Sequence, residues 1–118
     1  MVKKIILDTN FILDCIKFHI DIKTEIFKVI DENFSLNIFD INKKELRDKE
    51  YENLALELLN KLNINIINTN SSNVDQAIFT LDKKDLIVAT SDKKLKEKLK
   101  KANIQILIIR EKQRLRLI

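Results

Sequence analysis

Short apolar segments alternate with segments of helical periodicity along the whole chain of 118 residues. Five of the apolar segments have the length of buried strands: Lys3–Leu7, Ser35–Phe39, Ile64–Ile67, Leu86–Ala89 and Ile104–Ile109. Alternation of this kind is typical of parallel sheets with helices on both faces. We therefore expect an α/β fold of three layers (αβα) around a central parallel sheet of about five strands. We expect a single domain over residues 1–118.

The segments between these strands show apolar residues at three- and four-residue spacing, most clearly from Tyr51 to Leu62. Further helices are expected from about Phe11, over Ile22–Glu32, over Ile41–Asp48, from Val74 to Leu81 and from Leu95 to Ala102. The last segment, Arg110–Ile118, mixes basic and apolar residues. We expect it to form a final strand or arm.

The chain contains no glycine, no proline and one cysteine. Without glycine it cannot contain the glycine-rich loops that bind nucleotide phosphates, nor the glycine-flanked turn of serine hydrolases. A single thiol cannot close an intrachain disulfide or supply a zinc cage, which favours a reducing, intracellular setting. No apolar run approaches the roughly 20 residues that span a bilayer. We expect a cytoplasmic protein, and the net charge of +4 favours a polyanionic partner over a membrane.

Four acidic residues follow four of the expected strands. Asp8 closes the first strand, Glu45 lies after the second, Asp75 opens the helix after the third, and Asp92 opens the helix after the fourth. In a parallel sheet with right-handed crossovers, the carboxyl ends of all strands lie at one edge, and ligands bind there. We therefore expect these four carboxylates to lie in one crevice.

Four carboxylates this close together repel one another unless they bind protons or cations. Their oxygen-only chemistry suits Mg²⁺ or Mn²⁺ rather than structural zinc. A divalent ion there would activate water and stabilise a phosphoryl transition state. Lysines on the surrounding surface would attract a polyanion. This combination predicts hydrolysis of phosphodiester bonds.

Each of these residues also has a simpler interpretation. Asp75 and Asp92 stand where helix N-termini favour an acid, and Glu45 could be an exposed helical charge. Asn10 either caps the helix from Phe11 or hydrogen-bonds Asp8, whereas Thr90 and Ser91 either orient the Asp92 carboxylate or simply precede a helix. One crevice accounts for all four acids more economically than four independent causes.

At these residues the sequence resembles the PIN-domain nucleases. The blocks that carry the resemblance are Ile6-Leu7-Asp8-Thr9-Asn10, Lys44-Glu45-Leu46, Val74-Asp75-Gln76-Ala77-Ile78 and Val88-Ala89-Thr90-Ser91-Asp92. The resemblance implies an αβα fold and endoribonuclease activity that depends on Mg²⁺ or Mn²⁺. It implies that Asp8, Glu45, Asp75 and Asp92 are the catalytic metal ligands, supported by Asn10 and Thr90. Gln76 departs from relatives that carry a second acid beside Asp75, which leaves the number of metal ions open.

Two branches of this family are similar to the chain. The segments Asp8–Leu13 and Asn103–Gln113 resemble small archaeal PIN proteins related to ribosomal-RNA processing nucleases, which implies a ribosome-assembly partner. The alternative branch is the PIN toxins, which implies an antitoxin partner. A PIN module that binds RNA or protein without catalysis is a further alternative, and a homodimer is open in each case.

The basic residues near the fourth strand and in the C-terminal tail are the candidates for RNA binding. They are Lys93, Lys94, Arg110, Lys112 and Arg114. We expect the tail to contribute to RNA docking or to a subunit interface.

Overall fold

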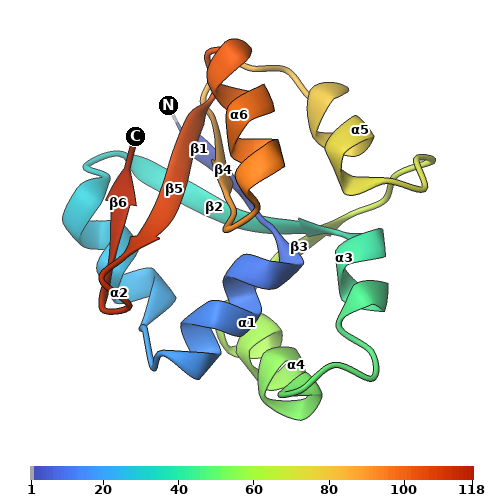
Figure 1. The fold of residues 1–118 in the computed structure, drawn as a ribbon, viewed down its shortest axis with the longest axis vertical. Coiled ribbons are helices and arrows are strands. Elements are labelled where there is room, and N and C mark those ends of the chain that lie inside the picture. The colour runs from blue at the N-terminus through green and yellow to red at the C-terminus, as the bar shows by residue number, and fades with distance from the viewer. Residues whose placement is uncertain (1) are drawn as a thin grey trace.

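The computed structural model describes residues 2–118 and contains one six-stranded sheet of order β3-β2-β1-β4-β5-β6 (Figure 1). The elements are β1 (Val2–Leu7), α1 (Thr9–Lys17), α2 (Ile22–Val29), β2 (Asn33–Phe39), α3 (Asp40–Glu45), α4 (Glu52–Lys61), β3 (Asn65–Ile67), α5 (Val74–Phe79), β4 (Leu86–Ala89), α6 (Lys93–Lys101), β5 (Gln105–Arg110) and β6 (Arg114–Leu117).

The first five strands are parallel, as the alternation of strands and helices predicts. The sixth strand comes from the C-terminal tail and pairs antiparallel with β5. Leu115 of β6 is only 3% exposed, and β6 packs against α2. The tail is therefore part of the core, and its removal would destabilise the fold rather than delete a separate binding arm.

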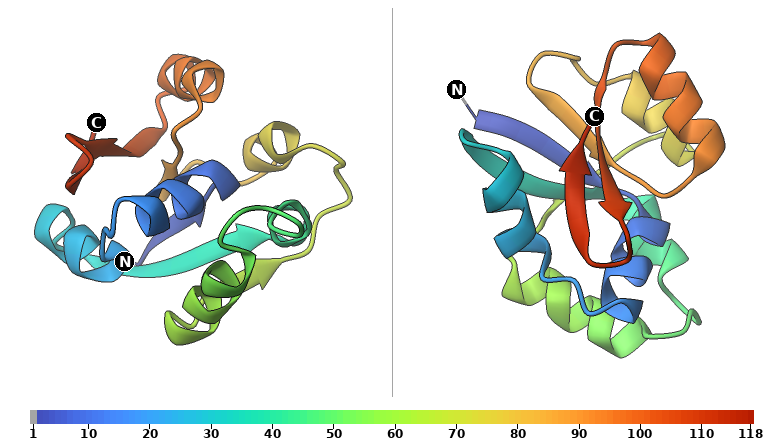
Figure 2. Two further views of the ribbon diagram at one scale, coloured as in Figure 1. Left: turned by 60° about the horizontal axis from the view of Figure 1, so that its bottom comes forward. Right: turned by 60° about the vertical axis from the view of Figure 1, so that its left-hand side comes forward.

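Helices cover both faces of the sheet, which confirms the three-layer architecture (Figures 1 and 2). One core cluster fills the side of α1, α2 and α4, and includes Phe11, Ile26 and Leu59. The second cluster fills the side of α5 and α6, and includes Ile78 and Leu95. Within residues 2–118 no helix is both long and apolar enough to cross a membrane.

Several helices differ at their ends from the expectation. Helix α3 ends at Glu45 rather than Asp48, and α5 ends at Phe79 rather than Leu81. Helix α1 begins at Thr9 rather than near Phe11, because the carboxylate of Asp8 accepts a hydrogen bond from the backbone N–H of Thr9 and caps the helix. Helix α2 ends at Val29, where the next residue already has an extended backbone and leads into β2. The expected helix up to Glu32 is therefore three residues too long.

The chain makes its tight turns without glycine. Among residues 2–118, eight non-glycine residues have positive φ. Most of them are Asn, Asp or His, but two are Glu111 and Lys112 in the turn between β5 and β6. The N–H of Gln113 donates to the carbonyl of Arg110 across this turn at 3.0 Å. Positive φ at both central residues is the pattern of a type I′ turn, for which Asn and Gly are the preferred residues. A left-handed backbone costs a side chain such as that of Glu111 about 1–2 kcal/mol.

Replacement of Glu111 by Asn is therefore expected to stabilise the protein. Asn tolerates positive φ better than Glu, so the free energy of unfolding should rise by about 0.5–1 kcal/mol and the melting temperature by roughly 2–6 °C. The exposed ion pair of Glu111 with Arg114 contributes little to oppose this gain. Thermal melts of Glu111→Asn measure the effect. Gln113→Asn is the control, because residue 113 does not have positive φ. A lower melting temperature for Glu111→Asn than for the unchanged protein would contradict this view of the turn.

Candidate active site

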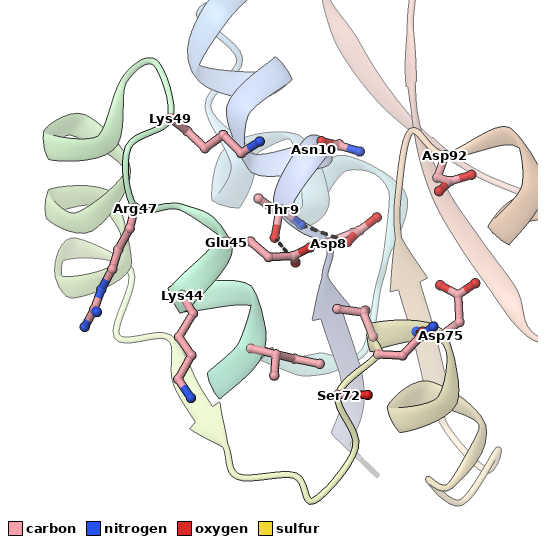
Figure 3. Close-up of a pocket in the computed structure, with 13 residues that line it drawn as sticks. Asp8, Thr9, Asn10, Lys44, Glu45, Arg47, Lys49, Ser72, Asp75 and Asp92 are labelled. Atoms are coloured by element: carbon pink, nitrogen blue, oxygen red, sulfur yellow. Dashed lines mark hydrogen bonds between the residues drawn. The ribbon is translucent and has the colours of Figure 1, made fainter.

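A cavity of about 730 Å³ lies at the carboxyl edge of the sheet (Figure 3). It adjoins the boundary between β1 and β4, where the strand order changes direction, which is the usual place for a ligand site in an open α/β sheet. The four acids predicted from the sequence all line this cavity: Asp8, Glu45, Asp75 and Asp92. They come from the end of β1, from α3, from α5 and from the residue before α6.

Asp8 is the most buried of these acids, with 8% of its surface exposed. The Thr90 hydroxyl donates to Oδ2 of Asp8 at 2.8 Å, and the backbone N–H of Thr9 donates to Oδ1 at 2.9 Å. Burial raises the pKa of Asp8 above its ordinary value of 3.8. The two hydrogen bonds oppose this rise, whereas the charges of Glu45 and Asp92 add to it. Asp8 is thus a fixed carboxylate in a negative electrostatic field.

Glu45 is held by a small polar network at the end of α3. The Thr9 hydroxyl donates to Oε1 of Glu45 at 2.9 Å, and the Asn42 amide donates to Oγ1 of Thr9 at 3.1 Å. Asn42 is fully buried and also accepts a hydrogen bond from the backbone N–H of Phe39. Thr9 therefore connects two of the acids, because its backbone contacts Asp8 and its side chain contacts Glu45.

Asp75 and Asp92 both reach the cavity from the side opposite Glu45, and their carboxylates point toward one another (Figure 3). Asp92 is the N-cap of α6, and its Oδ1 accepts from the backbone N–H groups of Lys94 and Leu95. Asp75 is not a cap, because Asn73 fills that position in α5. Instead, Oδ2 of Asp75 forms an ion pair with Nζ of Lys98 at 3.2 Å. Capping thus accounts for two of the four acids, Asp8 at α1 and Asp92 at α6, and removes neither of them from the cavity.

Comparison with known proteins decides the family. The family model described as "PIN like domain" matches residues 5–112. The chain belongs to the PIN-like domain family. Ribonuclease VapC4 of Methanocaldococcus jannaschii is 36% identical over 121 positions, which cover 93% of this chain and 92% of that protein. The solved structure of the PIN domain endonuclease Utp24 superposes with a TM-score of 0.81 at 25% identity, and covers 97% of this chain and 90% of that one.

In this PIN-domain protein the supporting residues agree only in part with those expected, because Thr90 contacts an acid of the site and Asn10 does not. The Thr90 hydroxyl bonds the carboxylate of Asp8 and the backbone N–H of Asp92, not the Asp92 carboxylate. Asn10 does not cap the first helix, because Asp8 does; it lies exposed at the lining of the cavity. Ser91 lines a different, neighbouring pocket. Thr9 and Asn42, which sequence reasoning missed, make the contacts that hold Glu45.

One signal in the sequence points to Asn42. It lies three residues before Glu45 in a short helix, and residues at this spacing share a helix face. Thr9 lay within the first block of the family resemblance, but its contact with Glu45 joins residues 36 positions apart. Only the packing of α1 against α3 creates that contact.

The acids share a cavity but are not drawn together into a metal cage. Over residues 2–118, no three His, Cys, Asp or Glu side chains are arranged so that they could hold one ion. Asp8, Glu45 and Asp92 are occupied by hydrogen bonds, and Asp75 by Lys98. Binding of an ion by several of these acids therefore requires some of these side chains, though not all of them, to move toward the middle of the cavity.

The basic residues that line the cavity are not those expected from the sequence. Lys44, Arg47 and Lys49 line it, on α3 and the segment after α3. Lys93 and Lys94 stand at the exposed start of α6, outside the cavity lining. The other three expected residues, Arg110, Lys112 and Arg114, belong to the β5–β6 hairpin. There the ammonium of Lys112 lies 5.5 Å from the ring centre of Phe18, and Arg114 forms an ion pair with Glu111.

The raised pKa of Asp8 predicts a pH-dependent cost to stability. The folded protein holds the proton of Asp8 more tightly than the unfolded chain does, so the contribution of Asp8 to stability falls as pH rises through the interval between 3.8 and the higher folded-state pKa. Asn at this position does not titrate. Without metal, the free energy of unfolding of Asp8→Asn minus that of the unchanged protein should therefore increase as pH rises from about 3.5 to 7.

Urea unfolding in EDTA at several pH values measures this difference. Asp31→Asn, which alters an exposed carboxylate before β2 at the opposite edge of the sheet, corrects for the change in net charge. A difference between Asp8→Asn and the unchanged protein that stays constant with pH would show that Asp8 is not desolvated.

Proposed function

We propose that this protein is a divalent-metal-dependent endoribonuclease that hydrolyses RNA phosphodiester bonds. The observation that carries the proposal is the convergence of Asp8, Glu45, Asp75 and Asp92, from four different elements, on one cavity. Membership of the PIN-like family supports it, as do a relative named as a ribonuclease and a similar structure named as an endonuclease. PIN nucleases generally use divalent metal ions.

The donor set fits such an ion. All four side chains offer carboxylate oxygens, the ligands that Mg²⁺ and Mn²⁺ prefer. Burial raises the pKa of Asp8, and the charges of Glu45 and Asp92 add to that rise, so a cation would relieve a repulsion that already exists in the cavity. We propose that Asp8, Glu45, Asp75 and Asp92 hold Mg²⁺ or Mn²⁺. When bound, the ion supplies charge stabilisation to the phosphate and activation to water.

The protein itself contributes fixed positions. Thr90 and Thr9 hold both oxygens of Asp8, so this carboxylate keeps one orientation with little conformational freedom. The network of Thr9 and Asn42 limits the rotation of Glu45 in the same way. Side chains ordered before the substrate arrives lower the entropic part of the barrier, because a displaced catalytic group is costly to reposition.

Two biological settings follow from the two branches of the family that the sequence resembles. From the resemblance to ribosomal-RNA processing nucleases we propose a ribosomal-RNA precursor as substrate and a ribosome-assembly partner, and the fold similarity to the endonuclease Utp24 over 97% of the chain supports endonuclease action. The resemblance to PIN toxins gives the alternative, a toxin-type ribonuclease with an antitoxin partner, and the higher identity to Ribonuclease VapC4 supports ribonuclease action. Both settings require the same chemistry at the same cavity.

The proposal predicts that RNA cleavage requires both the metal and the acids. A labelled single-stranded RNA should be cut with Mn²⁺ and left intact in EDTA. Asp8→Asn and Asp92→Asn should each lower the rate about 100-fold or more, because each removes a charge that acts on the transition state. Asp31→Asn is the matched control and should keep the full rate.

Circular dichroism of the same samples separates lost chemistry from lost fold. Undiminished cleavage by both Asp8→Asn and Asp92→Asn would remove these acids from the mechanism. Binding of RNA by the folded, unchanged protein without cleavage in any metal would favour the non-catalytic module.

A further inference from the structure

Three basic side chains line the carboxylate cavity and form no ion pair with any acidic residue of the described range 2–118. These residues, here called the basic segment, are Lys44 at the end of α3 and Arg47 and Lys49 in the turn after it. All three are exposed. The ion pairs formed within residues 2–118 use other side chains, among them Lys98 with Asp75. Unpaired cations beside a cluster of acids remain free to bind an external anion.

The backbone holds the basic segment in place. Leu46, in its middle, is fully buried in the core. The N–H of Arg47 donates to the carbonyl of Lys44, and the N–H of Lys49 donates to the carbonyl of Leu46. The turn then passes through Asp48, which has positive φ and whose N–H is bound by the carboxylate of Glu52. The three cations therefore project from a turn with a defined conformation.

The cations and two of the acids occupy opposite sides of the cavity (Figure 3). Lys44 and Arg47 extend along the outer side of α3, away from Asp75 and Asp92, whereas Lys49 extends across toward Asn10. The arrangement is not a set of internal ion pairs. A chain of phosphates that runs along α3 would meet the basic side chains first and the carboxylates next.

This order of charges matters for a phosphodiester substrate. Four carboxylates repel a phosphate, and a metal ion offsets that repulsion only for the phosphate in contact with it. The neighbouring phosphates of the same strand need other cations, and Lys and Arg supply them in nucleic-acid sites. No aromatic ring of residues 2–118 lines this cavity, so base stacking is not available to supply the affinity.

We propose that the basic segment, Lys44, Arg47 and Lys49, binds the backbone phosphates of single-stranded RNA on one side of the scissile bond, independently of base sequence. The proposal rests on the proposed function in taking RNA as the substrate of the cavity. It assigns to the α3–α4 turn the role that the sequence suggested for Lys93, Lys94 and the β5–β6 hairpin.

Binding measured without metal tests this proposal separately from catalysis. Fluorescence anisotropy in EDTA, with labelled 12-nucleotide single-stranded RNAs of two different sequences, gives the dissociation constant over a range of salt concentrations. The test variant is Lys44→Gln/Arg47→Gln/Lys49→Gln. The control is Lys61→Gln/Lys100→Gln/Lys101→Gln, which makes the same change in net charge at exposed positions outside the cavity. A third variant, Lys93→Gln/Lys94→Gln/Lys112→Gln, tests the residues suggested by the sequence.

The test variant should bind both RNAs at least tenfold more weakly at moderate salt, and the slope of log K against log salt should become shallower by about 2, since each phosphate contact in a single strand contributes roughly 0.7. The control should change affinity by less than about twofold. Equal losses in the test and control variants would overturn the proposal, as would a larger loss in the third variant. Affinity of the unchanged protein for polyglutamate equal to that for RNA would also overturn it, in favour of an acidic protein partner.

Cleavage assays on the same samples distinguish a failure of the proposed nuclease activity from a failure of the proposed RNA binding by the basic segment. Metal-dependent cleavage by the unchanged protein, with no selective loss of RNA binding in the test variant, would reject the basic segment and leave the nuclease intact. Selective loss of binding without any cleavage would support the basic segment and reject the nuclease.

Discussion

The parallel pairing of β1 with β4 is the constraint on which the site depends. In this register Ile6 lies beside Val88 and Leu7 beside Ala89, so the next residues, Asp8 and Thr90, leave the sheet together. The N–H of Asp8 donates to the carbonyl of Ala89, and the Thr90 hydroxyl donates to the Asp8 carboxylate across 82 positions of sequence. A shift of one residue between these strands would turn one of the two side chains toward the opposite face.

The site concentrates negative charge and controls it with local partners. Asp8 is stabilised by two hydrogen bonds, Asp92 by the N-terminus of α6, and Asp75 by Lys98. These contacts keep the carboxylates ordered but leave their negative charge in the cavity. Burial raises the pKa of Asp8, and the charges of Glu45 and Asp92 add to that rise. A divalent ion would neutralise part of the remaining negative charge of the carboxylates. The basic segment would neutralise the neighbouring phosphates of the substrate.

Much of the fold could be predicted from the sequence because burial leaves a periodic pattern. β4 was predicted to the residue, since its four residues are all buried and form a continuous apolar run. The place of Asp8 could also be predicted, because an acid directly after a buried strand must lie at the carboxyl edge of the sheet. The start of α1 was wrong by two residues, since that boundary depends on which side chain caps the helix, and Asp8 and Asn10 are both suitable caps.

The supporting contacts and the basic lining could not be predicted, because they depend on where α3 packs. Asn42 and Thr9 are 33 positions apart, and neither pattern nor propensity indicates that their side chains meet. Lys44, Arg47 and Lys49 have the appearance of a solvated helix face in the sequence. They become part of the cavity only because α3 lies at the carboxyl edge, beside the end of β1.

The central claim is that these four carboxylates jointly bind a divalent ion. Crystals of the unchanged protein soaked in Mn²⁺ test it most directly, since the anomalous scattering of manganese locates the ion without assumptions about its ligands. We predict an anomalous peak within the cavity, in contact with Asp8 and at least one of the carboxylates facing it, and no such peak in Asp8→Asn crystals. A cavity without manganese, or manganese bound only at another surface, would contradict the account.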